Sequence, residues 1–279
     1  MRSIYGEYVT NKNAPKKQEQ DIYKAYDILL RNLTRIREYC ERENQDWPII
    51  VSGVEGSGKS TLAIQIAQHL DPGFTLQDNL IYGFADGPQS MRAFWDRFKT
   101  VPFKAPVYDE AVTFLFSQKH TSKEAKECQV LFKLKRECLH FDVMVVQSYW
   151  DMVLDIRERR AKSMIYTYVD AINIPGQPAP KFIHKFAYYS GQKMIELSMS
   201  NKARKAFKSP GQLFKIIRPE FFGEFPDMPV DLQKAYKELK WQNMTNYADG
   251  VFGTAGKTGH IGIEKTLDFD RFEDKYCKG

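Results

Sequence analysis

Short apolar blocks alternate with longer amphipathic segments through the middle of the chain, between residues 48 and 170. The first apolar block is a β-branched run typical of a buried parallel strand, and the longer segments between the blocks have the spacing of helices. This alternation favours an α/β fold with a doubly wound, mainly parallel sheet. We expect strands at 49–51, 80–82, 105–108, 143–146 and 164–169, and helices at 61–70, 90–99, 121–139 and 150–161.

A further helix is expected before this core, from about Gln18 to Arg42, where apolar residues recur every three or four positions. Such spacing places them on one stripe of a helix. We expect the stripe to dock on the core of the same chain. A neighbouring subunit is the alternative, since a heptad-like seam suits both partners. The stripe consists of Ile22, Tyr26, Leu29, Leu33, Ile36 and Cys40.

The pattern changes after Asp170, where three prolines mark a turn region. The segments 182–189 and 193–198 flank Ser190-Gly191 and predict a β-hairpin. A short helix is expected at 228–242. The chain is therefore divided into an N-terminal arm and helix (1–46), a core (47–170), a basic hairpin and helix extension (171–242) and a glycine-containing tail (243–279).

The net charge of +6 is concentrated in residues 181–218, which contain nine Lys or Arg and one acid. Aromatic residues interleave with the basic ones there. Cations that bind phosphates and rings that stack on bases are typical of nucleic-acid surfaces. The alternative is a solvated strand pair whose rings lie in the core. The candidate nucleic-acid contacts are Lys181, Lys185, Lys202, Arg204, Lys205 and Lys208.

The four cysteines are scattered and form no CxxC pair, which argues against a disulfide framework or a zinc site. A reducing cytoplasm is the expected location, and for a viral protein this means the host cytoplasm. No apolar run approaches the ~18 residues that a bilayer-crossing helix needs, so no membrane span is expected.

The strongest motif is GVEGSGKS at 53–60, which matches G-x-x-x-x-G-K-[ST] at every fixed position. Glycines let successive backbone N–H groups point at phosphates, and the following helix adds its N-terminus. Lys59 is expected to reach the β- and γ-phosphates of ATP, and the Ser60 hydroxyl to bind Mg²⁺. The candidate nucleotide-binding residues are Gly53, Val54, Glu55, Gly56, Ser57, Gly58, Lys59, Ser60 and Thr61.

Two acids follow the third predicted strand, and a polar residue follows the fourth. Asp109 is the candidate for the Mg²⁺ shell, and Glu110 for the base that activates water. This acid pair favours ATP hydrolysis over phosphoryl transfer to a metabolite. Gln147 is expected to sense the γ-phosphate or hold the water, because ligands lie beyond the carboxyl ends of such strands.

Arginines form the remaining candidates for catalysis. Arg136 precedes the fourth strand, and Arg157, Arg159 and Arg160 cluster after it. An arginine from a neighbouring subunit stabilises transition-state charge in ring ATPases. Arg136, Arg157 and Arg160 are candidates for that role, and a solvated helix face is the alternative for the cluster.

The segments VSGVEGSGKST, APVYDEA and KRECLHFDVMVVQSYWD together resemble the FtsK–HerA branch of additional-strand ATPases. In that branch an Arg precedes the fourth strand and a Gln ends it, as Arg136 and Gln147 do here. The ATPase part of zonular occludens toxin-like proteins and archaeal virus or plasmid DNA-packaging or transfer ATPases look similar. The resemblance covers residues 48–170. It implies a RecA-like P-loop fold, Mg-ATP hydrolysis, a homo-oligomeric ring and DNA translocation.

We therefore predict a P-loop core with an N-terminal helix and a C-terminal hairpin and helix extension. The leading hypothesis is a ring-forming ATPase that translocates or packages double-stranded DNA, with a possible virion or mobile-element protein partner. A nucleotide-switched regulator or loader is the second hypothesis. A small-molecule kinase is the third, and the Asp109-Glu110 pair argues against it.

Overall fold

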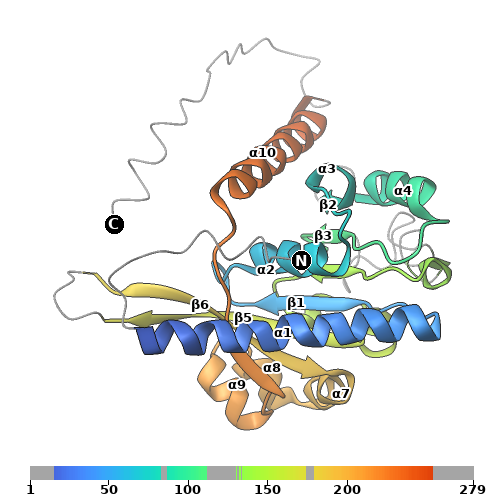
Figure 1. The fold of residues 1–279 in the computed structure, drawn as a ribbon. Helices are drawn as coiled ribbons and strands as arrows, with labels where there is room; N and C mark the ends of the chain where they lie inside the picture. Colours follow the sequence, from blue (N-terminus) through green and yellow to red (C-terminus); the bar gives the residue numbers. More distant parts are fainter. Residues whose placement is uncertain are drawn as a thin grey trace.

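The computed structural model describes residues 16–82, 87–111, 130, 132, 134–173 and 179–253 (Figure 1). The helix predicted over 121–139 lies largely outside these residues, as do much of the tail and the first 15 residues. None of the helices within the described part combines the length and apolar composition needed to cross a bilayer.

A seven-stranded sheet organises the described part of the chain, with the strand order β2-β3-β4-β1-β5-β6-β7. The first five strands in this order pair in parallel, and β6 and β7 continue the sheet antiparallel. All five strands predicted for the core are present. The strands are β1 (Ile49–Gly53), β2 (Leu80–Tyr82), β3 (Val107–Asp109), β4 (Val143–Val145), β5 (Ser163–Ile172), β6 (Lys181–Ser190) and β7 (Phe221–Glu224).

Helices cover both faces of the sheet, so the predicted doubly wound arrangement is confirmed (Figure 1). Alternate residues of β1 point to opposite faces: Ile49 and Val51 pack in the cluster with α1 and α2, whereas Ile50 packs in the cluster with α7, α8 and α9. The α-helices are α1 (Lys16–Glu43), α2 (Lys59–Leu70), α3 (Leu76–Asn79), α4 (Gly87–Phe98), α7 (Gly191–Met199), α8 (Asn201–Ala206), α9 (Pro210–Ile216) and α10 (Val230–Gly253).

The N-terminal helix α1 docks on the core of its own chain. Leu29, Leu33 and Cys40 of its apolar stripe are completely buried, and they pack in one cluster with residues of α2 and the sheet. The Tyr26 hydroxyl also donates to Gln65 Oε1 of α2, at 3.3 Å. Burial of apolar surface on this scale makes α1 part of the core, as the 3.6-residue period predicts.

The hairpin predicted at 182–189 and 193–198 is wrong in its second arm. Residues Gly191–Met199 form helix α7, whose Met194 and Leu197, three positions apart, are both buried. The strand β6 pairs instead with β5 along its full length, from Ser163–Ser190 to Ile172–Lys181. The hairpin is therefore formed by β5 and β6, and each arm is ten residues long.

Two other helix predictions change in detail. The segment expected as one helix at 150–161 contains a 3₁₀ turn, η2 (Tyr149–Asp151), and a π-helical turn, η3 (Asp155–Arg160). The helix expected at 228–242 is α10, which continues to Gly253. Its first half contacts the acids beside the phosphate loop, as described below.

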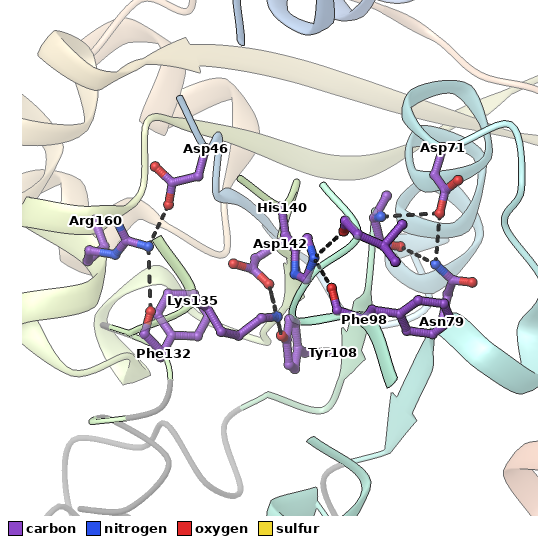
Figure 2. A network of polar contacts seen from close by, with 12 residues as sticks. Asp46, Asp71, Asn79, Phe98, Tyr108, Phe132, Lys135, His140, Asp142 and Arg160 are labelled. Carbon is purple, nitrogen blue, oxygen red and sulfur yellow. Dashed lines mark hydrogen bonds and ion pairs between the residues drawn. The ribbon is translucent and has the colours of Figure 1, made fainter. Parts of the chain in front are cut away.

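Buried polar residues fix the segments that enter the sheet at the amino ends of β1 and β4 (Figure 2). Lys135 and Asp142 are completely buried and form an ion pair at 2.5 Å, and the Tyr108 hydroxyl donates to the same Asp142 oxygen at 2.8 Å. Arg160 and Asp46 form a second pair at 2.5 Å. Charged groups are retained in such interiors only when they are paired. The first set of contacts joins the segment before β4 to β3, and the second joins the segment before β1 to the turn before β5.

Candidate functional site

The loop between β1 and α2 has the geometry of a phosphate-binding loop. Gly56 and Gly58 adopt left-handed backbone angles, with φ of +71° and +79°, and Gly58 is the N-cap of α2. Glycine adopts these angles without the steric cost that a side chain imposes. The loop therefore curls tightly and leads directly into the N-terminus of a 12-residue helix, where unpaired N–H groups attract anions.

Thr167 of β5 supports this loop, and the sequence analysis did not identify it. A Cβ on Gly53 would lie 2.0 Å from the Thr167 carbonyl oxygen, so only glycine fits at that position. Val54 N–H donates to the same oxygen at 3.1 Å, and the Ser57 and Thr167 hydroxyls are hydrogen-bonded at 2.6 Å. No local sequence pattern marks Thr167, because its role depends on the pairing of β5 with β1.

The side chain of Lys59, the first residue of α2, contacts the backbone of the phosphate loop. Its Nζ donates to the Val54 and Gly53 carbonyl oxygens at 2.9 and 3.3 Å. Burial lowers the pKa of Lys59, and the nearby carboxylates of Glu110, Glu55 and Asp109 oppose that shift. A hydrogen bond from an ammonium group to an anion is stronger than one to a neutral carbonyl. The position of the half-buried Lys59 ammonium therefore suits a phosphate oxygen as a partner.

Ser60 and Asp109 meet at the start of α2 and the end of β3. The Ser60 hydroxyl donates to Asp109 Oδ1 at 2.9 Å, and Asp109 is completely buried. Hard cations such as Mg²⁺ prefer oxygen ligands, with one or two carboxylates and phosphates completing the shell. The two side chains therefore fit the predicted magnesium-binding role, and the structure brings them together across 49 positions of sequence.

Glu110 follows Asp109 in a strained conformation. Its φ of +56° lies in the left-handed region, which costs a non-glycine residue about 1–2 kcal/mol. Burial and the charge of Asp109 raise the pKa of Glu110, whereas Lys240 and Lys59 oppose the rise. A carboxylate with a raised pKa beside a phosphate loop has the properties of a general base.

Two residues of α10 reach the same acids, and the sequence analysis missed both. The Tyr236 hydroxyl donates to Asp109 Oδ2 at 2.7 Å. Lys240 Nζ lies 3.5 Å from Asp109 Oδ2 and 3.8 Å from Glu110 Oε1. The site is thus assembled from β1, α2, β3 and α10, and the last of these lies more than 120 positions from Asp109 in the sequence.

The other candidate residues of the core lie in different places. The side chain of Gln147 is exposed just after β4, and its backbone carbonyl accepts from Ser52 of β1 at 3.4 Å. It therefore lies at the carboxyl edge, beside the strand that leads into the phosphate loop. This is the edge at which the prediction of a γ-phosphate sensor places it.

The candidate arginines do not join the phosphate loop of their own chain. Arg136 is exposed on η1 (Lys135–Cys138), which precedes β4, whereas the loop follows the carboxyl end of the neighbouring β1. Arg160 is engaged by Asp46, as described above, and Arg157 donates to the Trp150 carbonyl at 3.2 Å. Among the three, Arg136 alone presents an exposed side chain.

The predicted nucleic-acid residues also separate into groups. Lys202, Arg204, Lys205 and Lys208 are exposed on α8 and the turn that follows it. Lys181 is exposed at the start of β6. Lys185 instead lies between two carboxylates, 2.7 Å from Asp170 and 3.6 Å from Glu224. Its charge is therefore compensated within the chain, which makes it a poor candidate for a phosphate contact.

The loop after β1, the acid pair at the end of β3 and the strand β4 between these two strands define the fold of a P-loop NTPase. No protein-family model and no curated protein sequence matches the chain. Among solved structures, it is similar to P-loop proteins at low identity.

The N-terminal domain of zonular occludens toxin from Neisseria meningitidis is 10% identical, with a TM-score of 0.41, over 68% of this chain and 98% of that one. The genome packaging NTPase B204 from Sulfolobus turreted icosahedral virus 2, in complex with ATP-gammaS, is 14% identical, with a TM-score of 0.35, over 53% and 94%. A KaiC-like protein from Pyrococcus horikoshii is 12% identical, with a TM-score of 0.36, over 52% and 79%. The class of this chain accordingly rests on its own sheet order and loop geometry.

Proposed function

We propose that the chain is a Mg²⁺-dependent ATPase that acts as a ring-forming DNA motor. The observation that supports hydrolysis most directly is the contact between Ser60 and Asp109 at 2.9 Å, with Lys59 in the loop beside it and Glu110 next in sequence. A phosphate loop, a metal-binding hydroxyl, a buried carboxylate and a second acid together are the parts that ATP hydrolysis needs.

Each part has a defined task in this proposal. The loop N–H groups and Lys59 bind the phosphates and orient the terminal one. Ser60 and Asp109 would hold Mg²⁺, which when bound supplies positive charge to the phosphate oxygens. Glu110 accepts a proton from the attacking water, and its raised pKa makes it a stronger base than an exposed glutamate. Gln147 positions that water or the terminal phosphate.

Phosphate release from ATP tests the hydrolytic part. We expect the purified chain to release phosphate with Mg²⁺ and to lose activity when EDTA is added. Lys59→Ala should abolish nucleotide binding, whereas Lys99→Ala, an exposed lysine of the segment after α4, should leave it unchanged. If the wild-type chain neither binds nor cleaves any common nucleotide, the proposal is wrong.

The four exposed cations in and after α8 support a nucleic-acid partner. They provide the kind of surface that binds a phosphate backbone without reading sequence. We expect double-stranded DNA to stimulate the ATPase rate, and a combined Lys202→Glu and Arg204→Glu variant to lose the stimulation but keep the basal rate. An ATPase rate that does not change when DNA is added would contradict a motor and favour a nucleotide-switched regulator or loader.

The exposed position of Arg136 supports a ring, because it is available to the nucleotide of a neighbouring subunit. In a ring, a Lys59→Ala subunit still offers its arginine, and an Arg136→Ala subunit still offers its phosphate loop. Mixing the two inactive variants should therefore restore part of the ATPase activity. If ATPase activity is restored when Lys59→Ala is mixed with Arg160→Ala, and not when it is mixed with Arg136→Ala, the role in the neighbouring site belongs to Arg160 and the assignment of Arg136 is wrong.

A further inference from the structure

The helix α10 is anchored independently of its contacts with the acids. Leu232, Ala235 and Leu239 follow one face of the helix and pack with Ile64 of α2 and Leu76 of α3. The Tyr82 hydroxyl donates to the Tyr236 carbonyl at 3.3 Å, and the two rings stack with centroids 6.4 Å apart.

The segment before α10 is fixed as well. The Gln65 side chain donates to the Pro226 carbonyl at 2.9 Å, and Met228 is buried with Ile64. The first half of α10 is therefore held against α2, the helix that carries the phosphate loop at its N-terminus. This packing positions Tyr236 and Lys240, so their contacts with the acids follow from the fold rather than from loose surface side chains.

The two oxygens of the buried Asp109 have different hydroxyl partners. Oδ1 accepts from Ser60 of α2, and Oδ2 accepts from Tyr236 of α10. A carboxylate that accepts two directed hydrogen bonds has its plane fixed. Each oxygen keeps a further lone pair, so a metal-bound water can still donate to it.

The helix α10 brings a second cation to the site. Lys59 and Lys240 provide two positive charges, which face the carboxylates of Asp109, Glu110 and Glu55. A Mg²⁺–ATP complex adds further negative charge on its terminal phosphate. Lys240 keeps about a third of its side chain exposed. It is therefore able to move from the carboxylates to a phosphate oxygen placed beside them.

We propose that α10 is part of the nucleotide site, with Tyr236 as a positioning residue for Asp109 and Lys240 as a cation that contacts the terminal phosphate in the same chain. This inference rests on the proposed ATPase function and assigns two residues that the phosphate-loop motif does not include. It also predicts that the site distinguishes ATP from ADP, because Lys240 of α10 contacts the terminal phosphate that only ATP carries.

Binding of fluorescent ATP and ADP analogues, with and without Mg²⁺, tests the assignment of Lys240. We expect Lys240→Met to weaken ATP binding by about tenfold, the usual size of one charge-assisted contact, and ADP binding by less than about twofold. Lys240→Arg should restore most of the ATP affinity. The matched control is Lys237→Met, an exposed lysine three positions earlier on the same helix.

Tyr236→Phe removes only the hydroxyl. We expect it to raise the Mg²⁺ concentration that gives half-maximal ATP binding by roughly three- to tenfold, since one hydrogen bond to a charged group is lost. Binding without Mg²⁺ should stay unchanged. Circular dichroism and the melting temperature of each variant establish that the fold is intact.

The outcomes separate the two proposals. If the wild-type chain binds ATP, Lys59→Ala does not, and both α10 variants behave as wild type, the role of α10 is wrong and the ATPase stands. Tighter binding in both α10 variants would also overturn the inference, because α10 would then be a lid that excludes nucleotide. If the wild-type chain binds no nucleotide, the proposed function fails and this inference fails with it.

Discussion

The hydroxyls of Ser57 and Thr167 share a hydrogen bond of 2.6 Å, which links the phosphate loop to β5 across 110 positions of sequence. Ser57 also donates to the Val54 carbonyl, at 2.5 Å, so it bridges the loop's own backbone and the neighbouring strand. Both residues are buried. The curvature of the loop therefore depends on a strand that the motif does not contain.

Thr167→Val keeps the volume of the side chain and removes its hydroxyl. We expect a destabilisation of about 1–3 kcal/mol, because Ser57 is left with a buried polar group that lacks one partner. ATP affinity should fall together with stability, because the loop loses its support. Denaturant unfolding and nucleotide titration measure both effects. Thr100→Val, at an exposed position, is the control; an equal loss there would contradict the role of Thr167.

Gly53→Ala should be far more harmful than Gly56→Ala. A Cβ at Gly53 meets three backbone atoms of Thr167 within 2.8 Å, whereas one at Gly56 meets nothing within 4 Å and only the left-handed φ opposes it. We expect Gly53→Ala to prevent folding or to separate β1 from β5, and Gly56→Ala to cost about 1–2 kcal/mol. Thermal melts compare the two. Gly211→Ala, at an open site in α9 with ordinary φ, is the reference that should not destabilise the fold.

Glu110→Gln should retain ATP binding and lose turnover by a factor of roughly 10²–10⁴, the usual contribution of a general base.

The Glu110→Gln variant should also be more stable than the wild type at neutral pH. Burial and Asp109 raise the pKa of Glu110 above its ordinary 4.5, so the folded state disfavours the ionised form. Stability is therefore lost as the pH rises from the unfolded pKa through the folded one, and it stays lower above both.

Melting temperatures of the wild type and Glu110→Gln across pH measure this effect. The advantage of the variant should be larger at neutral pH and should shrink as the pH falls, until it disappears below the ordinary pKa of 4.5, where Glu110 is protonated in both states. Glu38→Gln, at an exposed position of α1, controls for the change in net charge. An advantage that grows at low pH would contradict the assigned direction of the pKa shift.

Lys135 and Asp142 are expected to contribute to stability only as a pair. Both are completely buried, and both contact the Tyr108 hydroxyl (Figure 2). Lys135→Met alone should destabilise the fold by about 3–5 kcal/mol, because Asp142 is left as an unpaired buried charge. The double variant Lys135→Met with Asp142→Leu should recover most of that loss. A double variant no better than the single one would show that packing, rather than charge, determines the effect.

Much of the central fold was predictable because its rules are local. The phosphate loop is set by glycines at fixed spacing, and the strands β1 to β5 are set by short apolar blocks between helical segments. The stripe of α1 was predictable for the same reason: a period of 3.6 residues selects one face. The second arm of the hairpin predicted at 182–189 and 193–198 was wrong, because a segment as short as Gly191–Met199 does not distinguish the period of a helix from that of a strand. The pairing of β6 with β5 decided the outcome.

The sequence by itself determined the phosphate loop, the acid pair Asp109-Glu110 and the order of the core strands along the chain, since each depends on residues that are close in sequence. Only the tertiary structure decided that Thr167, Tyr236 and Lys240 complete the site. Their positions follow from the pairing of β5 with β1 and from the packing of α10 on α2. Contacts between residues more than 100 positions apart leave no spacing pattern in a single sequence, because the chain between them is free to vary in length without moving either partner.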